Sequence, residues 1–302
     1  MVLVAKATSD ILRAADKATP ELRAAILRAL EEMRKAVPNL EGLLEAGRID
    51  QVVDAVQVPI PDEVFATIRA SLQATAFTTI KPEAVTFGIE FNQVNPRAVR
   101  WAEQQAASLV SGITSPQRGP IRTAIVEGLE AGHHPRVIAR HLEGLVGLTN
   151  PHQRAVDRLF RASLDAGTPP RVAQRLADRK AKQLLRWRAE TIARTETIRA
   201  ANMGQQLVWE DAIDSGLLLP GTRKVWLATG DNRTCKICAV LDGQVVDVGG
   251  GFAVNRQATS FTRDGDEFTV RDTKPLPQPT TERVPPAHSR CRCTIILQQT
   301  QI

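Results

Sequence analysis

The phrases Cys235-Lys-Ile-Cys238 and His288-Ser-Arg-Cys291-Arg-Cys293 hold all four cysteines of this 302-residue chain. A Cys-x-x-Cys spacing lets two thiolates turn toward one ion, and zinc takes four Cys or His ligands in structural sites. The two phrases offer five such side chains, one more than a tetrahedral ion uses. They predict a structural zinc site that ties two distant segments of the chain together.

The second phrase runs into Thr294-Ile-Ile-Leu297, which has the composition of a strand. Alternation along a strand would put Cys291, Cys293, Ile295 and Leu297 on one face, with residues two apart separated by roughly 6.6 Å. Two thiolates can meet one ion from there. The same pattern also fits small thiols buried on the apolar face of a strand, and a third interpretation is one or two disulfide bonds.

The composition is typical of a globular protein, because 43% of the residues are apolar and 24% are charged. The length predicts about two domains. No apolar run of about 18 residues occurs, so we expect no transmembrane helix and no membrane partner. The start of the chain lacks the pattern of a signal peptide. These features predict folding in a reducing cytosol, where a metal site is favoured over disulfide bonds.

Basic residues are concentrated between Arg171 and Arg199. Nine Lys and Arg residues against three acidic ones leave an excess of six, which equals the net charge of +6 of the whole chain. Such a stripe can bind phosphates without reading bases, which would suit non-specific binding of a nucleic acid. A solvated helical face or a surface for an acidic protein is the alternative. The candidate surface residues are Arg175, Arg179, Lys180, Lys182, Arg186 and Arg188.

Residues 1–80 have the apolar periodicity of helices. Thr19-Pro20-Glu21 predicts a helix start, with a capping hydroxyl followed by proline and an acid in the first turn. Pro38 is expected to end that helix. Residues 81–95 alternate between apolar and small or polar side chains, which predicts a strand or an extended arm. Further helices are expected over 40–46, 50–57, 64–74, 97–110 and 115–130.

The middle of the chain contains a repeated phrase, because Leu129–Val137 matches Leu164–Val172 at an offset of 164 − 129 = 35 positions. Each copy predicts a helix ended by glycine, a two-residue turn and a new helix with proline in its first turn. His133 and His134 are expected to be turn residues, not ligands. The repeat predicts two helical hairpins of a bundle, with a DNA-binding helix-turn-helix as the alternative.

The longest helix is expected over Lys180–Leu207, where Glu190 and Arg194 are four residues apart and could pair on the helix surface. Strands are expected over 224–228 and 267–271. Residues 247–286 are rich in glycine, proline and polar side chains. Such a long insertion would be hard to hold in a compact domain without a cross-link, which a metal between the two cysteine phrases would supply.

These patterns predict an α+β fold with mostly helical N-terminal and middle regions and a small β-rich C-terminal domain that carries a Cys/His knuckle. The expected division is a helical N-terminal region with an extended arm over 1–94 and a helical domain with repeated hairpins over 95–215. A β-rich Cys/His domain with a long polar insertion follows over 216–302.

Five phrases stand in an informative order. They are Ile192-Ala-Arg-Thr-Glu196, Lys224–Ala228, Asp231–Cys238, Leu241-Asp-Gly243 and Pro285–Cys293. Together they resemble the Mu F-like minor head proteins of tailed phages, also called the phage head morphogenesis family, over about residues 95–297. The two cysteine phrases with Asp242-Gly243 and Pro285-Pro286 are the specific part of this resemblance.

The resemblance implies a protein present in a few copies inside the phage capsid near the portal vertex, and in the host cytoplasm during assembly. The implied partners are the portal protein, the major capsid or scaffold protein, and packaged DNA. The implied roles are head morphogenesis and DNA packaging or delivery. Cys235, Cys238, His288, Cys291 and Cys293 would form the family's Cys/His knuckle, and Arg194 and Glu196 would belong to its helix phrase.

Two alternatives to a structural protein follow from other residues. A nuclease or group-transfer toxin could use Arg194, Glu196, Asp231 and His288, and a DNA-binding regulator could use the repeated helical hairpins. Catalysis needs a nucleophile, a base or a metal with an open position. The sequence has no Gly-rich phosphate loop and no catalytic triad spacing, and its one strong cluster offers more ligands than one ion needs. We therefore expect a protein that is not an enzyme.

Overall fold

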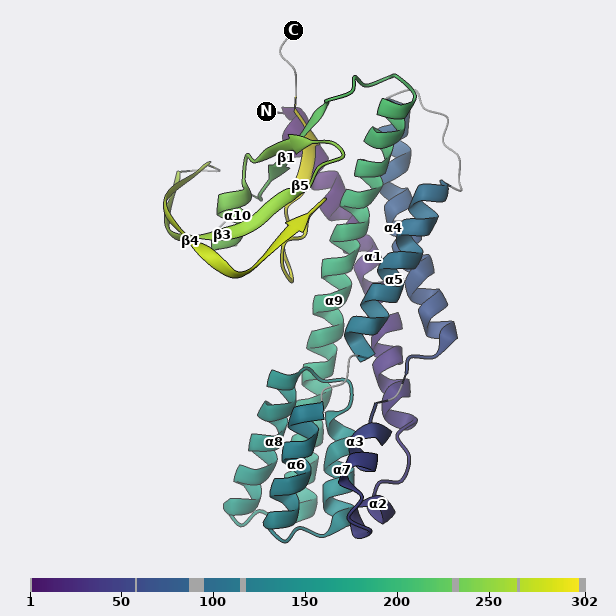
Figure 1. Cartoon of the computed structure of the whole chain (residues 1–302), viewed down its shortest axis with the longest axis vertical. Coiled ribbons are helices and arrows are strands. Elements are labelled where there is room, and N and C mark those ends of the chain that lie inside the picture. Colours follow the sequence, from purple (N-terminus) through teal and green to yellow (C-terminus); the bar gives the residue numbers. More distant parts are fainter. Residues whose placement is uncertain are drawn as a thin grey trace. The chain divides into compact units, whose positions relative to one another are not determined.

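A computed structural model describes residues 2–57, 59–86, 95–114, 118–229, 234–264 and 267–298 of the chain. It confirms the α+β class, since helices α1 to α9 precede a small β-rich region that also holds the short helix α10 (Figure 1). No helix in this described part is long and apolar enough to cross a membrane.

Contacts divide the chain into two compact units, and each unit draws on segments far apart in sequence. Unit 1 comprises Met1–Leu22, Arg69–Glu103 and Thr191–Ile302, and unit 2 comprises Arg23–Ile68 and Gln104–Glu190. The predicted division into 1–94, 95–215 and 216–302 does not follow these units. The reason is that four long helices, α1, α4, α5 and α9, each contribute residues to both.

The first helix, α1 (Val2–Lys35), runs through Pro20, so the predicted helix start at Thr19-Pro20-Glu21 is wrong. Proline lacks one backbone donor and normally disturbs a helix interior. The Thr19 hydroxyl donates to the Ala15 carbonyl at 2.7 Å and lies 2.9 Å from the Thr197 hydroxyl. Leu22 is fully buried just beyond the proline. Burial on both sides of Pro20 thus keeps the helix continuous.

Unit 2 is a helical bundle of parts of α1, α4, α5 and α9 together with five whole helices, namely α2 (Glu41–Glu45), α3 (Ile49–Ala55), α6 (Arg118–Glu130), α7 (Pro135–Leu145) and α8 (Asn150–Asp165). Helix α7 packs against α2, α6 and α8. The repeated phrase forms two helical hairpins as predicted, with Gly132 and Gly167 at φ values of +70° and +77°. The His134 ring accepts a hydrogen bond from the Arg136 N–H at 3.2 Å, which makes His134 a capping turn residue.

Two arginines satisfy carbonyls at the end of α7, where a helix leaves its last carbonyls without partners. Arg34 donates to the carbonyl of Val146 at 3.1 Å and also to that of Gly144. Arg188 donates to the carbonyl of Gly147 and is only 7% exposed. Arg188 therefore does not belong to the accessible basic surface in which the sequence placed it.

Helices α4 (Asp62–Thr86) and α5 (Pro96–Thr114) are longer than predicted. Because α4 continues to Thr86, the predicted strand or arm over 81–95 is wrong for residues 81–86, and residues 87–94 lie outside the described part. Asn95 caps α5, since its Oδ1 accepts the backbone N–H of Arg97 at 2.9 Å. Its amide group also donates to Asp211 at 2.8 Å, which attaches the start of α5 to the end of α9 within unit 1.

Helix α9 (Pro170–Asp214) has 45 residues and begins ten residues before the predicted start at Lys180. At a rise of 1.5 Å per residue its length is about 68 Å. The predicted Glu190–Arg194 pair is wrong, because Glu190 pairs with Arg23 at 2.9 Å and Arg194 pairs with Asp16 at 3.3 Å. Both partners, Arg23 and Asp16, belong to α1, so residues distant in sequence replace the neighbour on the same helix.

The β-rich part of unit 1 contains two antiparallel sheets. Strands β2 (Val245–Asp247), β1 (Arg223–Leu227) and β5 (Thr294–Leu297) form one sheet in that order. Strands β3 (Phe252–Asp264) and β4 (Glu267–Glu282) form a two-stranded ribbon, against which α10 (Lys236–Leu241) packs. The polar insertion is therefore an ordered ribbon where the sequence predicted only one short strand. A shared core holds Trp209, Trp226, Phe252, Ile295 and three of the cysteines.

Candidate metal centre

The start of a short helix positions the first cysteine phrase. Cys235 is the N-cap residue of α10, and its sulfur accepts a hydrogen bond from the backbone N–H of Cys238 at 3.4 Å. Cys238 lies in the first turn of the helix and is buried. The Cys-x-x-Cys spacing thereby brings two sulfurs to the same end of α10, as the sequence predicted.

The second phrase forms a loop between β4 and β5, which we call the ligand loop (residues 288–293). The N–H of Cys291 donates to the carbonyl of His288 at 3.2 Å, which closes a tight turn. Arg290 in this turn has a φ of +64°, in the left-handed region that non-glycine residues seldom occupy. Strand β5 begins only at Thr294, so Cys291 and Cys293 precede it, yet both are only 2% exposed.

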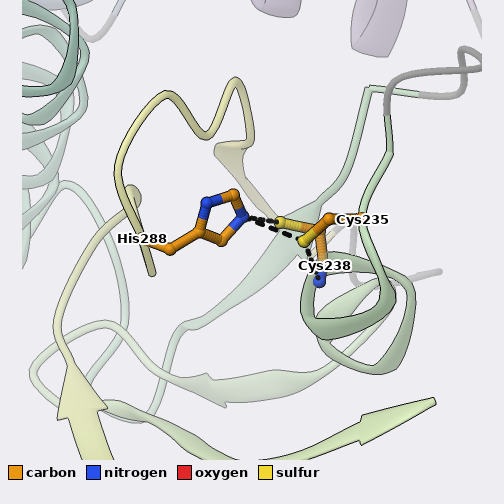
Figure 2. Close-up of side chains that lie close together, drawn as sticks. All are labelled: Cys235, Cys238 and His288. Carbon is orange, nitrogen blue, oxygen red and sulfur yellow. Dashed lines mark hydrogen bonds between the residues drawn. The ribbon is translucent and has the colours of Figure 1, made fainter. Parts of the chain in front are cut away.

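The two phrases meet at the imidazole of His288 (Figure 2). The His288 Nε2 atom lies 3.0 Å from the sulfur of Cys235 and 3.1 Å from the sulfur of Cys238. The other ring nitrogen, Nδ1, lies 2.9 Å from the carbonyl oxygen of Ser289. Such a contact fixes the ring orientation and leaves Nε2 to face the sulfurs, which is how metal-binding histidines are commonly held.

All five predicted ligands lie in this cluster, in two overlapping groups. Cys235, Cys238 and His288 form one group, and Cys238, Cys291 and Cys293 form the other, each with ligand atoms within 4.8 Å of one another. The Cys238 and Cys291 sulfurs are 3.6 Å apart, well beyond the bond length of a disulfide, and all four thiols are free. The cluster could therefore hold a metal ion.

Hydrogen bonding favours the thiolate at two of the four cysteines and opposes it at the other two. Hydrogen bonds with Cys235 and Cys291 raise the pKa of Cys238. At Cys293 a hydrogen bond with Cys238 acts to lower the pKa, but one with Cys291 and burial raise it above its usual value. A hydrogen bond from Cys238 lowers the pKa of Cys235 to about 4, and hydrogen bonds from Cys238 and Cys293 lower the pKa of Cys291 to about 2. A hydrogen bond with Cys235 raises the pKa of His288 to about 9, so its ring carries the opposite charge. Thiolates are the form that binds metals, and this donor set therefore fits a divalent cation that would displace the protons.

The ligand loop is held from one side by α9. The Thr195 hydroxyl accepts the backbone N–H of Arg290 at 3.0 Å. The Asn202 side chain donates to the carbonyl of Cys293 at 3.3 Å and accepts from the Thr294 hydroxyl at 2.9 Å and from the Ile295 N–H at 3.2 Å. Asn202 is fully buried, so these hydrogen bonds fix the end of the loop and the start of β5.

Comparison with known proteins identifies one family. The profile of the family described as Phage Mu protein F like protein matches residues 120–296. The chain belongs to this family. Its membership makes it a phage head morphogenesis protein, found in the virion. No curated protein and no solved structure matches the chain.

In this Mu F-like chain the helix phrase around residues 192–202 has a structural role that sequence reasoning missed. Thr195, Asn202 and Gln206 are seven and four positions apart, so they share one face of the helix. All three are buried. Buried polar side chains need hydrogen-bond partners. Polar residues at this helical spacing could therefore have predicted from the sequence that this face of α9 binds another segment of the chain.

The residues considered for catalysis are only partly brought together. Arg194 lines a cavity of about 320 Å³ beside the cluster, with Thr229, Thr234 and the ligands, and it pairs with Asp16 at 3.3 Å. Glu196 is buried and lies 3.5 Å from Arg199 in an ion pair along α9. Asp231 lies outside the residues that the structure describes.

Five basic side chains of the first half of α9 are exposed along one face. They are Arg171, Arg175, Arg179, Lys182 and Arg186. With 100° between successive residues they fall within an arc of about 80°. None of these five forms an ion pair with any other described residue of the Mu F-like chain. Lys180 is half-buried and Arg188 is buried, so the surface is narrower than the sequence predicted.

Proposed function

We propose that this chain is a minor structural protein of the phage head that associates with the portal protein and acts in head assembly and in DNA packaging or delivery. The observation that carries the proposal is the family match over 120–296, which includes both helical hairpins and the whole Cys/His cluster. We further propose a place inside the capsid near the portal vertex, with the major capsid or scaffold protein as a second contact during assembly in the host cytoplasm.

We propose zinc as the metal of the cluster. Zinc prefers thiolate and imidazole ligands in a tetrahedron, and two thiolates bound to it at about 2.3 Å would lie about 3.8 Å apart. The 3.6 Å between the Cys238 and Cys291 sulfurs is close to that separation. When bound, zinc would supply a structural cross-link between α10 and the ligand loop, which bracket the β3–β4 ribbon along the chain.

A structural role for the site is favoured over a catalytic one. Five protein ligands can fill every position of a tetrahedral ion, whereas a catalytic zinc keeps one position open for water. Arg194 and Glu196 both stand in ion pairs, with Asp16 and Arg199, that join or stiffen helices of unit 1. These contacts support the proposal that the chain is not an enzyme.

Cryo-electron microscopy of assembled heads tests the placement. We expect density for α9 and the Cys/His unit inside the capsid next to the portal, together with cross-links between this chain and the portal protein in mass spectrometry of the same particles. Density elsewhere in the particle, with no cross-link to the portal, would contradict the portal association. The chain would then be a head protein at a different position in the capsid.

We also propose that the exposed cations of α9 contact packaged DNA through its phosphates. Arg154 and Arg158 of α8 are exposed as well, and the two helices of this hairpin touch where the His152 ring lies 5.3 Å from that of Trp187, edge to face. The hairpin therefore carries seven exposed cations that no acidic residue of the described chain neutralises. Binding of this kind is independent of sequence and sensitive to salt.

The DNA contact has a matched test within unit 2. Replacing Arg175 and Arg179 by Gln on α9 should weaken binding to a random duplex of about 30 base pairs and reduce the slope of log K against log salt by about 2. Replacing Arg136 and Arg140 on α7, which are also exposed and four residues apart, removes the same charge elsewhere. Equal weakening by the two pairs would contradict the proposed surface.

A further inference from the structure

The cluster contains five candidate ligands, one more than a single tetrahedral ion binds. The distances between them indicate which candidate is not a ligand. Cys238 belongs to both groups of three, so it must be a ligand of any ion that the cluster holds. Cys235 and His288 complete the first group, with sulfur-to-nitrogen separations of 3.0 and 3.1 Å at the His288 Nε2. The fourth position therefore falls to Cys291 or to Cys293.

The Cys291 sulfur is placed as a ligand would be. It lies 3.6 Å from the Cys238 sulfur, near the separation of about 3.8 Å that two thiolates on one zinc ion would have. Cys291 sits directly after the left-handed Arg290, and its own N–H closes the turn onto His288. The same tight turn thus carries His288 and Cys291, and it can aim both side chains at one point.

Cys293 is held by the protein in another way. Its carbonyl accepts a hydrogen bond from the Asn202 amide at 3.3 Å, and the next residue, Thr294, already pairs with Leu227 of β1. The side chain of Cys293 interacts with the thiols of Cys238 and Cys291 and with Trp226, whose fully buried indole N–H has no hydrogen-bond partner among the described residues. An indole N–H is only a donor and a cysteine sulfur is a weak acceptor, so a Cys293 thiol that is not bound to the ion would suit the indole beside it.

We propose that the metal is bound by Cys235, Cys238, His288 and Cys291, and that Cys293 is a supporting thiol that packs between the ligands and Trp226. This assignment rests on the metal proposed above. It makes the centre a three-thiolate, one-imidazole site. Cys293 acts by fixing the position of Cys291 from two residues away, while its sulfur fills the apolar core next to the indole.

The assignment can be tested without changing the chain. In full-length protein loaded with ¹¹³Cd, correlation spectra between the metal and protons should show couplings to the β-protons of Cys235, Cys238 and Cys291 and to the ring of His288. No coupling to the β-protons of Cys293 is expected. A Cys293 coupling in place of the Cys291 coupling would overturn the assignment.

Two substitutions test the same point by metal content. Cys293→Ser keeps an oxygen acceptor for the Trp226 indole, so this variant should retain one metal per chain, the Co²⁺ spectrum of the wild type and an affinity reduced by no more than about tenfold. Cys291→Ser should change the Co²⁺ spectrum and lose more than about 100-fold in affinity. The reverse pattern, or equal loss in both variants, would refute the assignment. A wild-type chain that binds neither zinc nor Co²⁺ would instead refute the metal itself.

Discussion

Asn202 offers a sharp test of how α9 supports the metal centre. Its side chain makes three hydrogen bonds to the segment from Cys293 to Ile295, at 2.9 to 3.3 Å, and a fourth at 2.9 Å to the Ile198 carbonyl of its own helix. The side chain is fully buried. Alanine at this position would leave the hydrogen-bonding groups of the ligand loop and β5 unpaired, because water does not reach this buried position to replace the amide.

The expected cost follows from those partners. In Asn202→Ala the Cys293 carbonyl and the Ile295 N–H lose their contacts with the amide, while the Thr294 hydroxyl can still reach the carbonyl of Ile295 at 3.5 Å. A buried polar group left unpaired costs about 1–3 kcal/mol, so the two together should lower the free energy of unfolding by about 4 kcal/mol. For a unit of this size that is a fall of about 10 °C in Tm.

Urea unfolding followed by tryptophan fluorescence measures this loss. Trp209 and Trp226 are 1% and 0% exposed and lie in the core that also holds Cys293 and Ile295, to which Asn202 is hydrogen-bonded, so their emission reports on unit 1. The affinity for zinc should fall by about 10- to 100-fold in the same variant, because the ligand loop loses its support. Asn255→Ala is the control, since Asn255 is exposed on β3, and it should change the free energy by less than about 0.5 kcal/mol. A loss below about 1 kcal/mol in Asn202→Ala, with unchanged zinc affinity, would refute the reasoning.

Three further perturbations test other parts of the chain. Removal of the metal by a chelator at pH 7 should lower the Tm of unit 1 by more than about 10 °C. Cys238→Ser should lower the Tm by a similar amount, because both ligand groups include Cys238. Calorimetry that finds no change in Tm would contradict a structural metal. Gly147→Ala should lower the free energy of unfolding of unit 2 by about 2–3 kcal/mol, because the φ of Gly147 is +76° and a Cβ there would lie 3.1 Å from Leu30. Gly167 has a φ of +77° but nothing within 4 Å of its Cβ position, so Gly167→Ala should lower it by only about 1 kcal/mol in the same urea titration. Burial, with the nearby charge of Arg283, lowers the pKa of Lys224 from 10.5 to about 8, so between these values the unfolded chain binds the proton that the folded chain releases. The free energy of unfolding should therefore rise with pH across that window, by at most about 3 kcal/mol, and Lys224→Met of the zinc-loaded protein should lose this slope.

The sequence was informative where local chemistry decides the structure. The Cys-x-x-Cys spacing, the paired glycine and proline signals of the hairpins and the composition of β1 each depend on residues close together in the chain, and all three appear as predicted. The ligand types identified the cluster without knowledge of the fold, because few side chains bind soft metals.

The predictions from sequence were wrong where contacts between segments distant in the chain determine the structure. Pro20 continues a helix because buried neighbours on α1 outweigh the loss of one hydrogen bond. Glu190 and Arg194 could pair with each other on the helix surface, yet each pairs with a residue of α1, and helical periodicity carries no information about that choice. Strand β3 was missed because glycine and polar residues dominate the sequence around it, although Phe252, Val254 and Ala258 are buried on one side of the strand and the strand pairs with β4.

The spacing of the ligands has a consequence for the order of events during synthesis. Cys235 and His288 are 53 positions apart, with the β3–β4 ribbon between them. A nascent chain that has emerged only as far as that ribbon exposes two thiols and cannot yet surround an ion. Capture of the proposed metal would therefore follow translation of the ligand loop, and a tightly bound ion would mark a chain whose Cys/His cluster has been completed.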